Sequence, residues 1–132
     1  MKRAWDSGKS VRSVRPETIA DGIAVGAPIS ASLVLRDIRE SGGGFVTVSD
    51  ESMLQAIRTL AATGGILAEP AGAAAFAGLE PAMEAGLIDQ DETIVVHVTG
   101  TGLKSPQYLQ PKAPPIEINA TLEEVEQAIE SP

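Results

Sequence analysis

The chain has 132 residues, a net charge of −8 and a pI of about 4.5. That length suits one domain, or one piece of a larger domain, with a hydrophobic core. The acidic balance argues against nucleic-acid binding, because phosphate contacts need clustered Lys and Arg and the 10 in this chain are scattered. The lack of cysteine excludes disulfides and Cys-based zinc sites. No signal peptide or membrane-length apolar run is visible, so we expect a cytoplasmic protein without a membrane partner.

The N-terminal part of the chain shows no periodicity that would bury a face. Residues 1–16 are polar with scattered basic side chains, and we expect an extended lead-in that follows a missing N-terminal part. Residues 18–26 then alternate small and apolar side chains around Gly22 and Gly26. This pattern favours a tight turn in a core-facing loop and leaves open a close approach of the backbone to a ligand.

Two helices with a strand between them are expected next. Residues 29–40 have apolar side chains at helical spacing, and Gly42 is expected to cap the end of this helix rather than to form a phosphate loop. Residues 45–48 are a strand candidate. Ser49 or Asp50 is expected to cap a second helix that ends at the glycine pair 64–65 and turns these side chains inward: Met53, Leu54, Ile57, Leu60 and Ala61.

The following segment reads as strand, helix, strand and Gly-rich turn. Residues 66–68 form a short apolar run, a helix is expected from Pro70 to Gly86, and residues 93–98 are β-branched and almost continuously apolar. The alternation predicts an α/β fold, a three-layer mostly parallel sheet with flanking helices and right-handed crossovers.

The carboxyl ends of parallel strands border the ligand crevice of such a sheet, which directs attention to Glu69 and Thr99. Glu69 also stands beside a helix N-terminus, so a purely structural capping role and a functional role have equal weight. Gly100 and Gly102 let the backbone approach a ligand closely, but the third glycine of the dinucleotide fingerprint is missing. The single histidine, His97, is not expected to be a catalytic base, and we expect no metal site.

The C-terminal part is rich in proline. We expect residues 105–132 to be a surface tail with a short terminal helix. Thr121 and Glu124 are spaced as a capping box that opens this helix.

Several motifs carry a resemblance to a known family. The stretches 69–73 (Glu-Pro-Ala-Gly-Ala) and 98–104 (Val-Thr-Gly-Thr-Gly-Leu-Lys) resemble the paired C-terminal motifs of threonine synthase, a pyridoxal-phosphate enzyme of the tryptophan-synthase-β-like (fold type II) group. Residues 41–51 and 84–89 are also similar to this family in order and spacing. Residues 18–23 resemble the segment that lines the cofactor ring there and in threonine and serine ammonia-lyases.

The resemblance implies that residues 17–104 are the C-terminal α/β part of a pyridoxal-phosphate-dependent large domain. The complete enzyme would act on a small-molecule substrate: it would convert O-phosphohomoserine and water to threonine and phosphate. By the same resemblance, Thr99 supplies the hydroxyl that faces the pyridine nitrogen of the cofactor, beside Gly100, and Glu69 borders the ring. The remaining wall of the cofactor site would be formed by Asp21, Gly22 and Ile23.

The family's Schiff-base lysine and phosphate-binding loop are not recognisable in this sequence. Lys104 follows the ring-nitrogen Thr99 in the family pattern, which is the wrong place for the covalent anchor. We therefore expect no catalytic residue in the chain, no activity without the missing N-terminal part of the enzyme, and a homodimer when the enzyme is complete. The alternatives are a part of a threonine or serine ammonia-lyase and a non-catalytic fragment or interaction domain.

Overall fold

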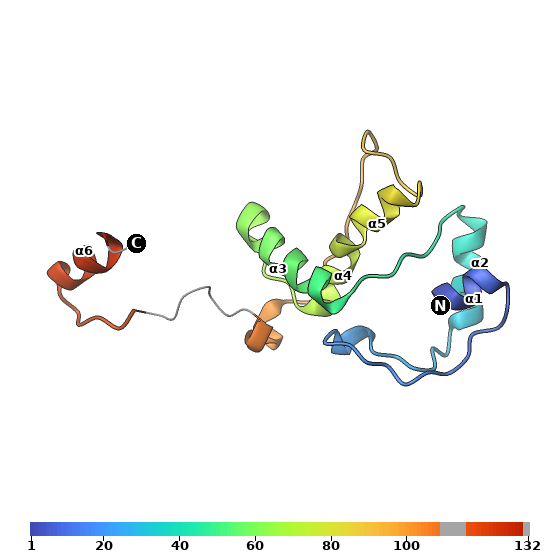
Figure 1. Cartoon of the computed structure of the whole chain (residues 1–132), viewed down its shortest axis with the longest axis horizontal. Coiled ribbons are helices and arrows are strands. Elements are labelled where there is room, and N and C mark those ends of the chain that lie inside the picture. Colours follow the sequence, from blue (N-terminus) through green and yellow to red (C-terminus); the bar gives the residue numbers. More distant parts are fainter. Residues whose placement is uncertain (109–115, 131–132) are drawn as a thin grey trace.

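The computed structural model describes residues 1–108 and 116–130 (Figure 1). In chain order, its helices are α1 (Lys2–Ser7), η1 (Asp21–Ile23), α2 (Ala31–Glu40), α3 (Asp50–Gly64), α4 (Pro70–Ala77), α5 (Leu79–Glu84), η2 (Gly102–Lys104), η3 (Pro106–Tyr108) and α6 (Leu122–Glu130). The elements written η are short 3₁₀ helices. No helix of the described ranges is long and apolar enough to cross a membrane.

The core lies between α3 and α4, which pack side by side (Figure 1). Its buried members are Ala56, Ile57, Leu60, Ala68 and Ala73. The small side chains of α4 let the two helices approach closely, while Phe76 and Val98 pack against the cluster from its rim. The expected inward face of α3 is confirmed at its buried residues Met53, Ile57 and Leu60, whereas Ala61 is exposed.

Both ends of α3 follow from local sequence. The Ser49 side chain accepts a hydrogen bond from the Ser52 amide, and the Ser52 hydroxyl accepts one from the Ser49 amide. This reciprocal capping box satisfies amide groups that have no partner inside the helix. At the other end Gly65 takes φ 64°, the left-handed conformation that only glycine adopts without strain. The expected caps are therefore confirmed.

The helix expected from Pro70 to Gly86 is two helices. α4 ends at Ala77 and α5 begins at Leu79, with Gly78 between them. Pro81 explains the break, because it has no amide hydrogen to donate to the carbonyl of Ala77 and its ring crowds that carbonyl. Gly86 does close α5 as expected, with φ 65°.

The expected sheet does not form within the described residues. Residues 45–48 and 93–98 are extended but lie in no β-ladder, and the bridge between Ala68 and Thr101 is isolated and antiparallel. A ladder needs a neighbouring backbone about 4.8 Å away along the whole strand. Val95 is 78% exposed, so no packed layer covers that side of its segment either.

The expected extended lead-in over residues 1–16 is wrong for its first part, which forms α1. The Trp5 ring meets the Phe45 ring edge to face with centroids 5.4 Å apart, and the Arg39 guanidinium lies 5.2 Å from the Trp5 ring centroid. Such contacts add about 0.5–1.5 kcal/mol to the burial of the rings themselves. A partner distant in the sequence thus stabilises a segment whose own pattern predicts no helix.

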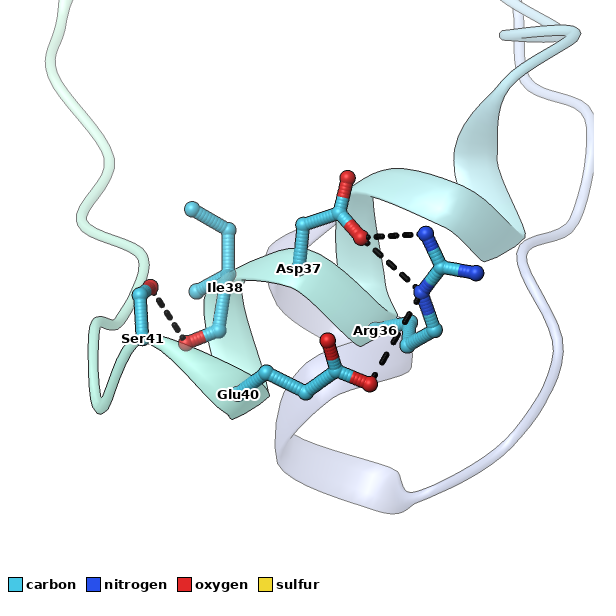
Figure 2. Close-up of polar contacts among 5 residues, drawn as sticks. All are labelled: Arg36, Asp37, Ile38, Glu40 and Ser41. Carbon is cyan, nitrogen blue, oxygen red and sulfur yellow. Dashed lines mark hydrogen bonds and ion pairs between the residues drawn. The ribbon is translucent and has the colours of Figure 1, made fainter.

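α2 presents charged side chains to solvent, and none of its residues is buried. Figure 2 shows the Arg36 guanidinium donating two hydrogen bonds to one carboxylate oxygen of Asp37, at 2.9 and 2.7 Å, and lying 3.8 Å from Glu40. The Ser41 hydroxyl donates to the carbonyl of Ile38 at the last turn. The expected cap at Gly42 is confirmed by its φ of 70°.

The C-terminal helix α6 forms where the capping pattern predicts it, but the Glu124 carboxylate has a different hydrogen-bond partner from the one expected. The Thr121 hydroxyl accepts the Glu124 amide at 3.4 Å, as in a capping box. The Glu124 carboxylate instead accepts the side-chain and backbone amides of Asn119, both at 2.7 Å. The prolines at 111, 114 and 115 lie outside the described residues.

Candidate functional site

The segment before α4 and the turn after residues 93–98 are held together by backbone hydrogen bonds. The Glu69 amide donates to the carbonyl of Gly100 at 3.0 Å, and the Gly102 amide donates to the carbonyl of Leu67 at 2.9 Å. These bonds flank the isolated bridge between Ala68 and Thr101. We call this pairing of residues 67–69 with residues 100–102 the clasp. It brings the two motifs with the strongest family resemblance into contact.

The carboxylate of Glu69 points into the clasp rather than capping the helix. Glu69 occupies the N-cap position of α4, but its side chain makes no cap hydrogen bond. One carboxylate oxygen lies 3.4 Å from the ammonium of Lys104, and the side chains of Glu69 and Lys104 are 14% and 67% exposed respectively. The interpretation of Glu69 as a capping carboxylate is therefore wrong, since Pro70 begins the helix without that help.

Glycines make this approach possible. A side-chain oxygen of Glu69 occupies the place where a Cβ would stand on Gly100. A Cβ on Gly72 would lie 2.7 Å from the carbonyl oxygen of Gly100. A Cβ on Gly22 would lie 3.2 Å from that of Ala71 and 3.8 Å from the Glu69 carboxylate. Gly22 and Gly100 thus border Glu69 with bare backbone, and Gly72 lets α4 approach the backbone of Gly100.

Asp50 positions the segment that contains Gly22. Its carboxylate accepts the hydroxyl of Thr18 at 2.6 Å and the amide of Ile19 at 3.1 Å. Ala20 is fully buried beside these bonds, and η1 follows directly and packs against α4. Asp50 lies in the first turn of α3, so the same helix that forms the core also fixes the approach of Gly22 to Glu69.

The structure therefore groups only some of the expected site residues. Glu69, Gly100 and Gly22 lie together, and the hydroxyl-bearing Thr99 precedes Gly100 with its side chain exposed. Asp21 and Ile23 are also exposed, on either side of Gly22.

Three further residues of this region were not expected as site residues. Gly72 and Lys104 lie inside the two resembling motifs and Asp50 was expected as a helix cap, but their contacts here are with residues distant in the sequence. Within residues 1–108 and 116–130, no group of three or more His, Asp or Glu side chains could hold a metal ion.

Residues 1–100 match the family described as pyridoxal-phosphate dependent enzyme. The chain is 42% identical over 115 residues to the threonine synthase of Methanosarcina acetivorans, a match that covers 86% of this chain and 28% of that protein. It is 47% identical over 91 residues to the threonine synthase of Methanocaldococcus jannaschii, a match that covers 69% of this chain and 22% of that protein. The chain thus spans about a quarter of the length of these curated relatives.

Among solved structures, the crystal structure of the T.th. threonine deaminase is similar with a TM-score of 0.50 and 27% identity, over 71% of this chain and 36% of that one. The expected resemblance to threonine synthase is confirmed by the curated relatives, which are 36–47% identical to this chain. The chain belongs to the family of pyridoxal-phosphate-dependent enzymes, whose cofactor is pyridoxal phosphate.

Proposed function

We propose that this chain is part of a threonine synthase-like enzyme that converts O-phosphohomoserine and water to threonine and phosphate. The likeness to threonine synthases over as much as 86% of the chain supports this reaction. The structural observation that carries the proposal is the clasp, which joins the two motifs of that resemblance and places the Glu69 carboxylate against Gly100 and near Gly22.

These residues fit one wall of a pyridoxal-phosphate site. Gly22 presents bare backbone beside Glu69 and leaves room there for a flat aromatic ring, whereas the Glu69 carboxylate fills the space over Gly100. Glu69 is shielded yet not fully enclosed, at 14% exposed. When bound, the cofactor supplies an electron sink for elimination and replacement at the substrate's carbon chain. Glu69, Asp21, Gly22 and Ile23 would line the ring, and the backbone of Gly100 would approach it.

Thr99 would hold the cofactor's pyridine nitrogen through its hydroxyl. The exposed side chain of Thr99 directly precedes the clasp, so it is free to face a ring bound there. A hydroxyl can share a hydrogen bond with that nitrogen, but unlike a carboxylate it does not stabilise a proton there. This limits carbanion stabilisation and favours β- or γ-elimination and replacement.

The covalent lysine and the phosphate-binding loop would be supplied by another part of the enzyme. The same part would complete the fold type II sheet by pairing with residues 45–48 and 93–98, which are extended in this chain. The apolar side chains of Ile94 and Val95, 39% and 78% exposed, are suited to being covered by helices packed on the faces of that sheet. A cytoplasmic homodimer is the expected form of the complete enzyme.

A threonine or serine ammonia-lyase is the second candidate. The similarity to the T.th. threonine deaminase structure favours it, because that structure is similar over the larger part of this chain. The two reactions differ in their products: the synthase releases inorganic phosphate and threonine, whereas the ammonia-lyase converts threonine to ammonia and a 2-oxo acid.

Reconstitution distinguishes these functions. The chain would be co-expressed with the part of the Methanosarcina acetivorans threonine synthase that it does not match, and the purified assembly assayed with pyridoxal phosphate. We expect phosphate release and threonine formation from O-phosphohomoserine, reduced at least about tenfold by Thr99→Val, as for loss of a positioned hydrogen bond to a reacting group. Thr63→Val, at an exposed position near the end of α3, is the matched control. Formation of a 2-oxo acid from threonine without phosphate release would support the ammonia-lyase instead.

The location of the covalent lysine has its own test. The chain alone is mixed with stoichiometric pyridoxal phosphate, reduced with borohydride and weighed as an intact protein. We expect an unchanged mass. A single adduct on Lys104 or Lys112 would contradict the assignment of the covalent lysine to another part of the enzyme.

A further inference from the structure

Lys104 follows the second segment of the clasp, residues 100–102, and forms an ion pair with the Glu69 carboxylate of the first segment. It is the last residue of η2, which begins at Gly102 of the clasp, while Glu69 directly precedes α4. The ion pair therefore joins the same two segments as the backbone hydrogen bonds of Glu69 and Gly102. Among the described residues, Lys104 is the cation within ion-pair distance of Glu69.

The Glu69 carboxylate depends on such a partner. It is mostly removed from water, it forms no cap hydrogen bond, and it lies in a chain with a net charge of −8. A shielded carboxylate without a hydrogen bond or a counter-ion is costly and turns toward solvent when it can. Its contact with the backbone of Gly100 therefore requires something to hold it there.

We propose that Lys104 is a positioning residue that holds Glu69 against Gly100 and neutralises it. It acts through Glu69 and is not itself a ligand of the cofactor. Positioning Glu69 is independent of the reaction, whereas neutralising Glu69 toward the substrate rests on the proposed function. O-phosphohomoserine carries a phosphate and a carboxylate, so an uncompensated Glu69 carboxylate beside the site would repel it.

The first test uses the chain alone and does not depend on catalysis. Amide hydrogen exchange is measured at Glu69 and Gly102, the donors of the clasp bonds. We expect Lys104→Gln to raise both exchange rates about threefold, a size typical of a partly exposed ion pair. Lys104→Arg, which keeps the charge, should stay within about twofold of the unchanged chain.

The matched control is Lys2→Gln. It removes one positive charge from the chain but breaks an ion pair with Asp6 in α1, at 2.8 Å. Its exchange rates at Glu69 and Gly102 should not change. Unchanged rates in Lys104→Gln, or rates raised equally by Lys104→Arg or by Lys2→Gln, would overturn the positioning role.

The second test uses the reconstituted assembly with O-phosphohomoserine. Lys104→Gln should raise KM about fivefold and change kcat less than about twofold, with KM restored by Lys104→Arg, because the lost charge acts on substrate approach. A fall in kcat with KM unchanged would overturn the neutralising role. If the reconstituted wild-type assembly forms no threonine, the proposed function fails, while hydrogen exchange still decides whether Lys104 positions Glu69.

Discussion

A carboxylate oxygen of Glu69 stands where the Cβ of any larger residue would lie at Gly100. The two residues are also joined by the hydrogen bond from the Glu69 amide to the Gly100 carbonyl, at 3.0 Å. Backbone and side chain of one residue thus contact the backbone of the other. This double contact gives the clasp its shape, and it makes the site sensitive to single methyl groups.

The clearest consequence concerns Gly72. A methyl group there would meet the carbonyl oxygen and the amide nitrogen of Gly100 at 2.7 and 2.9 Å, and backbone cannot rotate away as a side chain can. We expect Gly72→Ala to lower the free energy of unfolding by about 2–3 kcal/mol, measured by urea denaturation. Gly64→Ala is the control, because a Cβ at this position of α3 would lie 3.6 Å from the nearest atom, the Cδ1 of Ile66. It should raise the free energy of unfolding by about 0.5–1 kcal/mol. Equal effects of the two would contradict the backbone contact.

Gly100→Ala should act through Glu69. The added methyl forces the Glu69 side chain out of the clasp and separates it from Lys104, and we expect a loss of about 1–2 kcal/mol. In a Glu69→Ala background the same substitution should cost less, because the obstructing carboxylate is gone. A double-mutant cycle in urea measures this coupling. Strictly additive effects would show that the methyl clashes with something other than Glu69.

Asp50 should fix the segment around Gly22. Asp50→Ala removes the acceptor of the Thr18 hydroxyl and the Ile19 amide, and hydrogen bonds to a charged group contribute about 1.5–3 kcal/mol each. We expect a loss of at least about 2 kcal/mol and shifted NMR resonances in η1, which contains Gly22. The control is Glu51→Ala, which removes an exposed carboxylate from the same helical turn. Resonances of η1 that move equally in both variants would exclude a specific role for Asp50.

The start of α6 should respond to acid. The hydrogen bonds from the side chain and then the backbone of Asn119 hold the pKa of Glu124 below its ordinary value of 4.5. A lowered pKa means that the ionised form stabilises the folded state, so this contribution is present above pH 4.5 and is lost as the pH falls through the lowered pKa. We expect the Asn119 side-chain amide resonances to report a titration midpoint below 4.5 in NMR. Asn119→Ala should move the Glu124 midpoint back toward the ordinary value, and an unmoved midpoint would contradict this cause.

Local chemistry made much of the helical structure predictable. The capping side chain of Ser49 and the left-handed glycines Gly42, Gly65 and Gly86 act on residues within a turn or two, so their pattern is visible in the sequence. The break between α4 and α5 was equally local, but small apolar residues obscured the effect of the proline at position 81. In contrast, α1 depends on Trp5 meeting an aromatic ring 40 positions away in the chain, and no local pattern reveals that contact.

The site was predictable only where motifs marked it. Glu69, Gly100 and Gly22 stood out by their positions or by resemblance, and the structure brings them together. Gly72 and Lys104 lie inside those motifs, but their roles were missed because they arise from contacts across the clasp. The sheet is not seen in the described residues for a related reason: β pairing requires a partner distant in the chain, and an apolar strand pattern indicates what covers the faces of a strand but not where its partner is.

The clasp joins segments of one continuous chain, so its two sides are always at high effective concentration. The exposed turn at residues 89–92 lies between them and is a natural place for proteolysis. A cut there would leave every bond of the clasp intact, yet it would turn an intramolecular pairing into a bimolecular one. The wall of the site would then persist at high protein concentration and come apart on dilution.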